Sequence, residues 1–451
     1  MNYAPHTPED IRQMLDRIGV KNIDELFDTI PEELKYRHRF NLPRPLSEPE
    51  VISELSRLAR LNAGTDQLIC FAGAGAYDHY RPALIDTIIS RSEFYTAYTP
   101  YQAEVSQGTL QSIYEFQSLV CRLFEMEVAN ASMYDCASAL AETVHMARDI
   151  TGRSQVLVSA TVNPVYREVI ATYAHGLNVP IVAIPDKNLL TDLDRLQKLL
   201  NTDTAAVIIQ HPNFFGALEP VQEIGRLTHE AGGLLIVAVD PISLGILQPP
   251  GAYDADIAVA EGQGLGIPLS LGGPYLGILT AKKKYIRHMP GRIAARTVDV
   301  EGRTGYVLAL QTREQHIRRE RATSNICTNQ ALCALAATVY LAWMGKEGIK
   351  EVARQCLAKA TYLATAIAEI PGFKLPTSAP CFKEFVVETP VPAGEIIAAG
   401  VQQGILPGVD LGQFNPQWQN RLLVAVTERR TRQELNQYLS FIKQFRSNYG
   451  M

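Results

Sequence analysis

The residues whose types and spacing suggest chemistry centre on a glycine-rich segment, residues 256–277 of this 451-residue chain. The segment runs from an apolar stretch through the polar turn Glu261-Gly-Gln-Gly to a Gly-Gly-Pro sequence. Gln263 stands in the middle of that turn. Its amide can hydrogen-bond to a ligand or to backbone, but it cannot form the imine that a lysine amine would form at the same place.

This order of strand, polar turn and Gly-Gly-Pro resembles the way pyridoxal-phosphate enzymes of the aspartate aminotransferase type present the lysine that holds their cofactor. By that resemblance Gln263 replaces the Schiff-base lysine. The chain then looks like a cofactor-binding fold without its covalent anchor, which implies a partner that has kept it. Lysines 282–284 follow the Gly-Gly-Pro turn, whereas the anchor precedes it, so we expect these lysines at the surface.

Three more positions suit such a cofactor, and each also has a structural interpretation. Asp240 ends an apolar run, where a carboxylate can pair with a pyridine nitrogen or cap a turn; the neighbouring motifs favour the cofactor acid. Asn213 follows another run and can bond a ring hydroxyl, or supply the permissive backbone angles of a turn. Ser138 lies among small residues that open a helix, which suits a phosphate or simply close packing. In a chain without the lysine we expect all three to be vestigial.

A block of polar aromatic residues, 93–108, precedes a strong helical pattern over residues 110–124. A helix start does not require three tyrosines and two glutamates, so the block indicates an active-site wall or a subunit interface more than a packing loop. A similar segment, residues 71–80, contains a Gly-x-Gly without the setting of a dinucleotide motif. We expect it to form a tight loop near the same site.

A third segment, residues 318–325, joins three arginines to Thr323 and Ser324. Arginines followed by hydroxyl side chains suit phosphate contacts, including contacts across a dimer. A solvated run of charge is the alternative for the arginines.

The composition restricts the class of protein. The net charge is −5 with no basic block, which argues against nucleic acid as a main partner. Seven scattered cysteines without a Cys-x-x-Cys pair indicate neither a disulfide framework nor a zinc site. The N-terminus lacks the apolar core of a signal peptide, and no apolar run is long enough to cross a bilayer, so we expect a protein of the reducing cytoplasm.

Short apolar runs alternate with helical patterns between residues 156 and 280. The expected strands are 156–159, 181–184, 206–209, 234–239, 257–260 and 275–280, and the expected helices are 164–175, 191–201 and 219–231. Apolar strands alternating with helices predict a mostly parallel sheet covered on both faces, with ligands beyond the carboxyl ends of the strands.

We expect three regions along the chain. Residues 1–65 form a helical arm, with helix starts at Thr7 and Ser47; arms of this kind often lie along a partner subunit. Residues 66–330 form the large α/β domain, and residues 331–451 a smaller α+β domain. In the latter we expect helices at 330–343 and 347–369, strands at 383–388 and 421–426, and a final helix capped by Thr431.

Taken together, six blocks resemble the glycine cleavage system P-protein family in its two-chain bacterial form, and specifically the chain without the cofactor lysine. The blocks are residues 71–80, 94–104, 106–111, 130–135, 272–277 and 323–330. The resemblance implies an α/β pyridoxal-phosphate transferase fold of the aspartate aminotransferase type, with a mostly parallel seven-stranded sheet.

The same resemblance implies the activity. A partner beta chain would hold pyridoxal phosphate covalently, in a heterodimer or heterotetramer with this alpha chain. The complex would decarboxylate glycine and pass the aminomethyl group to the lipoyl arm of the H-protein, which is the glycine dehydrogenase (decarboxylating) reaction.

For this chain the resemblance suggests residues that face the partner's site. Tyr95, Tyr98, Tyr101 and Glu104 would orient substrate and exclude water, and Thr323 would reach the partner's phosphate. Two alternatives remain open: an independent pyridoxal enzyme that uses a lysine such as Lys282, and a non-catalytic binding or regulatory scaffold of the same fold.

Overall fold

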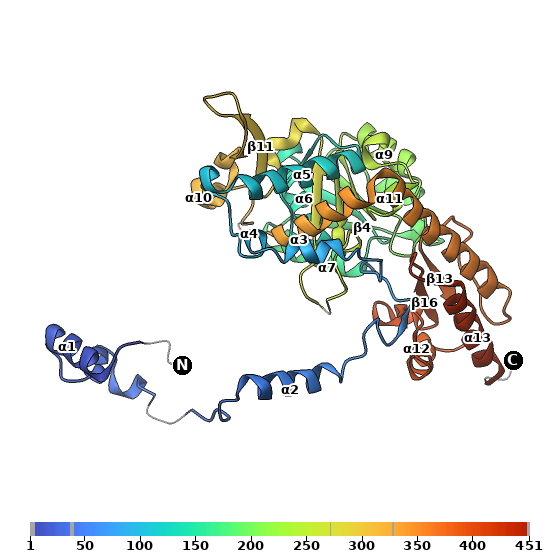
Figure 1. The fold of residues 1–451 in the computed structure, drawn as a ribbon. Coiled ribbons are helices and arrows are strands. Elements are labelled where there is room, and N and C mark those ends of the chain that lie inside the picture. The colour runs from blue at the N-terminus through green and yellow to red at the C-terminus, as the bar shows by residue number, and fades with distance from the viewer. Residues whose placement is uncertain (1–4, 37–39, 271, 327–328, 449–451) are drawn as a thin grey trace. The chain divides into compact units, whose positions relative to one another are not determined.

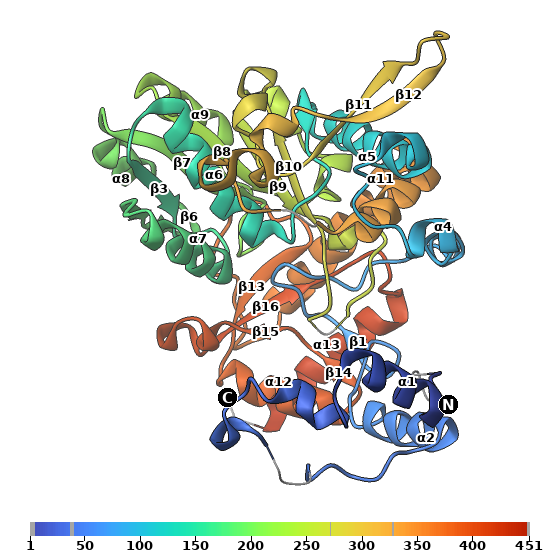
Figure 2. The ribbon, with the colours of Figure 1, turned by 90° about the vertical axis from the view of Figure 1, so that its left-hand side faces the viewer.

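The computed structural model describes residues 5–36, 40–270, 272–326 and 329–448 (Figures 1 and 2). Its contacts divide the chain into two units, Met1–Asn62 and Ala63–Met451. Among the described residues, none of the helices combines the length and the apolar character needed to cross a bilayer.

The first unit contains two amphipathic helices, α1 (Pro8–Ile18) and α2 (Glu48–Ala59). Both begin where the sequence predicts, at a capping box in which a hydroxyl residue and an acid bond to each other's backbone. The Thr7 N–H donates to Asp10 Oδ2 at 2.7 Å, and the Ser47 N–H donates to Glu50 Oε2 at 2.8 Å. No residue of either helix is buried.

The second unit is built on a seven-stranded sheet with the order β2-β10-β9-β8-β7-β3-β4. The strands are β2 (Val128–Ala129), β3 (Gln155–Ser159), β4 (Ile181–Ile184), β7 (Thr204–His211), β8 (Leu234–Val239), β9 (Ile257–Glu261) and β10 (Gly277–Ala281). Strands β4, β3, β7, β8 and β9 run parallel to one another, and β10 runs antiparallel to both of its neighbours, β9 and β2. The mostly parallel sheet is therefore confirmed.

Alternate residues of each strand pack into two separate cores, because successive side chains point to opposite faces. On one face Val207, Leu235 and Ile278 pack with helices α5 (Gln107–Phe124), α9 (Val221–Glu230) and α11 (Ala331–Ala368). On the other face, Ile208 and Ile236 pack with α6 (Cys136–Thr151) and α7 (Pro164–Gly176). The helical layers thus cover the sheet and leave the carboxyl ends of its strands to form a site.

The C-terminal part adds a three-stranded sheet of β13 (Glu384–Glu388), β16 (Arg421–Ala425) and β15 (Val409–Asp410). Helices α12 (Ala393–Gln402) and α13 (Arg432–Asn448) accompany it. Thr431 caps α13 as expected, since the Glu434 N–H donates to its hydroxyl at 3.2 Å. The two-residue strands β1 (Ile69–Cys70) and β14 (Ile405–Leu406) also pair here, in parallel.

Shorter elements complete the second unit. Helices α3 (Leu84–Ile89), α4 (Ser92–Tyr95), α8 (Leu193–Leu199) and α10 (Gln315–Arg318) lie in connections, with the strand pairs β5 (Asp186–Lys187)–β6 (Leu190–Thr191) and β11 (Ile293–Val298)–β12 (Thr304–Ala309). The two helices expected at 330–343 and 347–369 form the two parts of α11, which is interrupted at Gly345.

Candidate functional site

A small cavity lies at the carboxyl ends of the central strands. Its volume is about 40 Å³, enough for only a few water molecules, since one needs roughly 10–15 Å³. The polar residues that line it are Tyr77, Tyr166, Gln210, Asn213, Asp240, Glu261, Lys383 and Glu384. We call it the sheet-edge pocket.

Gln263 is buried beside this pocket, and its amide is fully engaged with backbone groups. Its Oε1 accepts from the Tyr77 N–H at 2.8 Å, and its Nε2 donates to the carbonyls of Tyr77 (3.0 Å) and Ile267 (2.9 Å). The residue at the expected lysine position thus ties the turn after β9 to the loop of residues 71–80. That loop is tight, as expected, with Gly75 at a φ of +116°. It lines the sheet-edge pocket, whereas Tyr95 and Tyr98 of the tyrosine block line a separate cavity, described below.

Asp240 has a partner from the C-terminal part of the chain. Lys383 Nζ lies 2.6 Å from Asp240 Oδ2, and Asp240 Oδ1 accepts from the Ile242 N–H at 3.0 Å. Asp240 therefore both caps a turn and carries an ion pair. Sequence reasoning missed Lys383, because nothing in the local pattern Phe-Lys-Glu-Phe indicates that this lysine is buried beneath the sheet edge.

The N-terminus of α6, where the small residues suit a phosphate or simply close packing, is occupied by acidic side chains. The Ser138 N–H donates to Asp135 Oδ1 at 2.7 Å, and the Cys136 N–H donates to Glu261 Oε2 at 3.2 Å. Burial raises the pKa of Glu261 to about 8. Helix N–H groups that would bind an external phosphate are bonded to the chain's own carboxyl groups.

Asn213 begins a turn and holds it through its side chain, whereas the positive backbone angle of this turn belongs to Gly216, at a φ of +84°. Its Nδ2 donates to the Leu189 carbonyl and to Glu219 Oε1, both at 2.8 Å. Its Oδ1 accepts from the backbone N–H groups of Phe215 (3.0 Å) and Ala217 (3.1 Å). An asparagine has two donors and one acceptor oxygen with two lone pairs, so this side chain has no hydrogen-bonding capacity left for a cofactor.

These contacts test whether pyridoxal phosphate fits this chain's own pocket. Asp240, the acid that would pair with the ring nitrogen, already pairs with the Lys383 ammonium. The N-terminus of α6, which would bind the phosphate, is bonded to carboxyl groups, and the side chain at the lysine position is the bonded amide of Gln263. The remaining space is far smaller than the cofactor. The residues present do not fit the group, and we derive no chemical step through it in this pocket.

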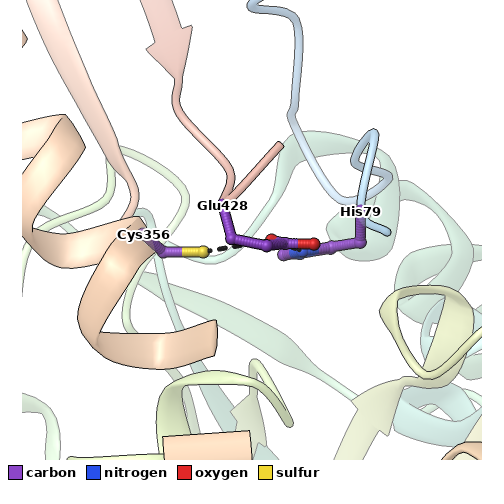
Figure 3. A group of neighbouring side chains, drawn as sticks. All are labelled: His79, Cys356 and Glu428. Atoms are coloured by element: carbon purple, nitrogen blue, oxygen red, sulfur yellow. Dashed lines mark hydrogen bonds and ion pairs between the residues drawn. The ribbon is translucent and has the colours of Figure 1, made fainter. Parts of the chain in front are cut away.

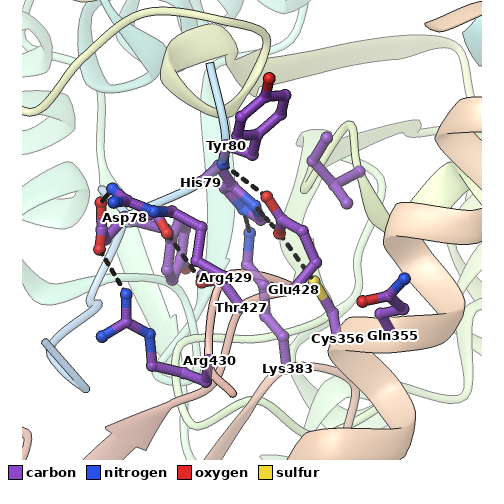
Figure 4. Close-up of polar contacts among 12 residues, drawn as sticks. Asp78, His79, Tyr80, Gln355, Cys356, Lys383, Thr427, Glu428, Arg429 and Arg430 are labelled. Atoms are coloured by element: carbon purple, nitrogen blue, oxygen red, sulfur yellow. Dashed lines mark hydrogen bonds and ion pairs between the residues drawn. The ribbon is translucent and has the colours of Figure 1, made fainter. Parts of the chain in front are cut away.

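A buried chain of ionisable groups continues from Lys383 (Figure 4), and Figure 3 shows its members His79, Cys356 and Glu428. Lys383 Nζ lies 2.9 Å from His79 Nε2, and His79 Nδ1 lies 2.7 Å from Glu428 Oε2. Because an ammonium can only donate, Nε2 accepts, and the proton on Nδ1 is donated to Glu428. Burial raises the pKa of Glu428, but its contacts with His79 and the Tyr80 N–H outweigh burial and lower that pKa.

The same chain includes Cys356, whose Sγ lies 3.5 Å from Glu428 Oε2. The ligand atoms of His79, Cys356 and Glu428 lie within 4.8 Å of one another, as a metal site would require. Burial, however, raises the pKa of the Cys356 thiol, and the Lys383 ammonium lies against the imidazole. A metal ion needs a thiolate and repels an ammonium, so the geometry favours a hydrogen-bonded chain.

The tyrosine block lines a different cavity, of about 280 Å³, which we call the tyrosine cavity. Tyr95 and Tyr98 line it and are 68% and 75% exposed. Tyr101 is also exposed, and its hydroxyl accepts from Nη2 of Arg292, a buried residue of the cavity wall that sequence reasoning missed. Glu104 is exposed in the 3-10 turn Ala103–Val105.

Thr323 lies at a third cavity, of about 460 Å³, with Glu142, His145 and Ser324. The Ser324 hydroxyl donates to Glu142 Oε1 at 2.9 Å, and burial raises the pKa of Glu142 to about 7. The expected site residues are therefore distributed: Asp240, Asn213, Gln263 and Ser138 gather at or beside the sheet-edge pocket, whereas the tyrosines and Thr323 do not.

The lysines after the Gly-Gly-Pro turn lie outside all three cavities. Lys282 Nζ lies 2.8 Å from Asp254 Oδ1 and 2.9 Å from Asp256 Oδ1. Lys283 and Lys284 are exposed. An independent pyridoxal enzyme that uses one of these lysines has no support in this arrangement.

Comparison with known proteins extends these observations. The sequence model of the glycine cleavage system P-protein family matches residues 1–442. A probable glycine dehydrogenase (decarboxylating) subunit 1 from Desulforamulus reducens is 54% identical over 96% of this chain and 98% of its own length. A similar subunit 1 from Carboxydothermus hydrogenoformans is 54% identical over 97% of this chain and 98% of its own length.

A solved structure of the same family is also similar to this chain. The crystal structure of a glycine decarboxylase (P-protein) of the glycine cleavage system, in inhibitor-bound form, has a TM-score of 0.91 and 42% identity. The match covers 98% of this chain and all of that chain. The fold class expected from the sequence is confirmed, and the chain belongs to the glycine cleavage system P-protein family.

Proposed function

We propose that this chain is the alpha subunit of a two-chain P-protein. With a second, lysine-bearing subunit it decarboxylates glycine and transfers the aminomethyl group to the lipoyl arm of an H-protein. The observation that carries the proposal is the internally bonded Gln263 beside a pocket whose acid, Asp240, already pairs with Lys383. The relatives are named subunit 1, which implies a second subunit.

In this proposal the two chains divide the work. Pyridoxal phosphate, held covalently by the partner subunit, supplies the electron sink for loss of the carboxyl group. This chain binds no cofactor of its own and provides walls, hydrogen-bond donors and part of the path for the lipoyl arm. The scaffold alternative lacks comparable support, because the relatives carry the name of an enzyme subunit.

The tyrosine cavity is the part of this chain best suited to that role. Tyr95 and Tyr98 present exposed rings with hydroxyl groups, which suits a surface that a substrate or a partner covers. Arg292 is only 4% exposed, donates to Tyr101 and lies 3.4 Å from Glu314, so the wall behind the tyrosines is buried and held by polar contacts. Such a wall orients a bound substrate and keeps water away from the reacting atoms.

Two other residues complete the proposed contribution. Glu104, exposed just beyond the tyrosines, would offer a carboxylate at the rim of the partner's site. Thr323, beside its own cavity, would donate its hydroxyl to the phosphate held by the partner.

Glycine–CO₂ exchange in the reconstituted complex tests the role of the tyrosines. We expect Tyr95→Phe and Tyr98→Phe each to lower the exchange rate roughly tenfold to a hundredfold, the effect of losing a hydrogen bond of about 1.5–3 kcal/mol. Tyr362→Phe is the matched control, since its hydroxyl bonds to Asn436 on α13, away from the tyrosine cavity. Unchanged exchange in both variants would remove these tyrosines from the proposal.

Borohydride reduction of the complex tests the division of labour. We expect a pyridoxyl label on the partner subunit and none on this chain. A label on this chain, or turnover of glycine by this chain purified alone, would overturn the proposed alpha-subunit function.

A further inference from the structure

The sheet-edge pocket contains a buried ammonium whose surroundings resemble a ligand site more than a chance ion pair. Lys383 is only 2% exposed. Its Nζ lies 2.6 Å from Asp240 Oδ2, 2.9 Å from His79 Nε2 and 3.5 Å from the centre of the Tyr77 ring. A carboxylate, an imidazole nitrogen and an aromatic face are the groups that recognise an ammonium ion.

The ammonium and the groups around it come from three distant parts of the chain. Asp240 follows β8, while Tyr77 and His79 belong to the loop that Gln263 holds, and Lys383 directly precedes β13. Each of the groups around the ammonium has a further contact that fixes it. Asp240 accepts from the Ile242 N–H, the Tyr77 hydroxyl donates to Glu384, and His79 Nδ1 bonds to Glu428. The walls around the ammonium are therefore held by bonds that do not involve Lys383.

We infer that the sheet-edge pocket is a binding site for a primary ammonium group, filled from within by Lys383, and that it accepts a free alkylammonium ion when this side chain is shortened. The inference rests on residues of this chain alone and is independent of the proposed glycine reaction. In the native chain Lys383 fills the site, and the cavity that remains has a volume of only about 40 Å³.

The matching ligand follows from the atoms removed. Lys383→Ala keeps Cβ and removes three methylene groups and the ammonium, which is the size and charge of n-propylammonium. Without it, the variant leaves Asp240 as a carboxylate without its cation, and an uncompensated buried charge is strongly destabilising. Binding of propylammonium to the folded state alone must then raise the temperature of unfolding.

Thermal unfolding of the full chain, together with its partner subunit where that is present, tests the inference. We expect Lys383→Ala to unfold several degrees below the native protein, and propylammonium to restore much of that loss with a saturable dependence on concentration. Native protein should show no such saturable rise. An effect of equal size with n-propanol, or no rise in the variant, would overturn the inference.

Two further variants control for size and position. Lys383→Met fills the space with an uncharged chain of similar length, and we expect it to be insensitive to propylammonium. Lys198→Ala removes an exposed lysine on α8 and should be equally insensitive. A saturable rescue of either variant would show that the amine acts outside the pocket and would overturn the site.

If Lys383→Ala does not fold at any amine concentration, a double variant decides. We expect Lys383→Met/Asp240→Asn to give more folded protein than Lys383→Met, because the carboxylate that needs a cation is gone. Equal or lower yield would overturn the inference. Glycine–CO₂ exchange reports on the partner's site and not on this pocket, so the two proposals can fail separately.

Discussion

At the residue scale, the sheet-edge pocket shows how buried charge is tolerated in this chain. Asp240, Lys383, His79 and Glu428 form a continuous series of contacts in which each group is paired. Buried polar networks are stable only when every member is satisfied, and breaking one member costs more than an isolated contact would suggest. Glu384, next to Lys383, is bonded by the Ala74 N–H at 2.7 Å and the Tyr77 hydroxyl at 2.6 Å.

Glu384 predicts a dependence of stability on pH. Burial raises its pKa from 4.5 to about 7 in the folded chain. The folded state therefore binds the Glu384 proton more tightly than the unfolded state does. The stabilisation that this proton provides is fully present below about pH 4.5 and is lost as the pH rises through about 7. Glu261, with a pKa raised to about 8, acts in the same direction.

We therefore expect Glu384→Gln to reduce the fall in unfolding free energy between about pH 5 and pH 8, by at most about 3 kcal/mol. A glutamine can still accept from the Ala74 N–H and donate to the Tyr77 hydroxyl. Denaturant titrations across this pH range measure the slope, with the exposed Glu369→Gln as a control for loss of one carboxyl group. An identical slope in the Glu384 variant and the native chain would contradict this assignment.

At the element scale, α11 is divided at Gly345, which has φ 59° and ψ −172°. Only glycine adopts this conformation without strain. An added Cβ would contact nothing within 4 Å, so any cost of substitution comes from the backbone and not from a clash.

We expect Gly345→Ala to lower the unfolding free energy by about 1–3 kcal/mol, the usual cost of such a backbone conformation in a non-glycine residue. Gly108→Ala, in the first turn of α5, is the control. It also has open space around its Cβ but no left-handed φ, so it should be neutral or stabilising by up to about 1 kcal/mol. Urea unfolding of both variants makes the comparison, and equal effects would show that the break in α11 is not fixed by its backbone.

The elements also show what the sequence could predict. The strands and helices around the main sheet were predictable, because apolar runs such as 206–209 and 234–239 alternate with amphipathic helices and their pairing follows from the parallel pattern. The two-residue strand β2 carries no such signal and was missed. Gln263 was recognisable from its place in a local motif, whereas Lys383 was not, since its contacts with Asp240 and His79 join segments far apart in the chain.

At the scale of the whole molecule, the first unit presents apolar side chains that its own fold does not bury. On α2, Ile52 and Leu55 are 58% and 59% exposed, and none of the residues of this helix is buried. A helix with an apolar side and no covered residue gains little from folding alone, because most helical stability in proteins comes from packing that side. We therefore expect the second subunit of the complex to cover it.

A double variant on α2 tests this expectation. Ile52→Asp/Leu55→Asp should weaken association with the partner subunit about tenfold or more, because two charges replace apolar contacts that would otherwise leave water. Ser53→Asp is the matched control: it is also exposed, and at 100° per residue it lies on the opposite side of the helix. Sedimentation or light scattering of mixed subunits measures the change. Equal affinity of the double variant and the Ser53 variant would show that this side of α2 does not contact the partner, whereas selective loss in the double variant would assign the arm to subunit assembly.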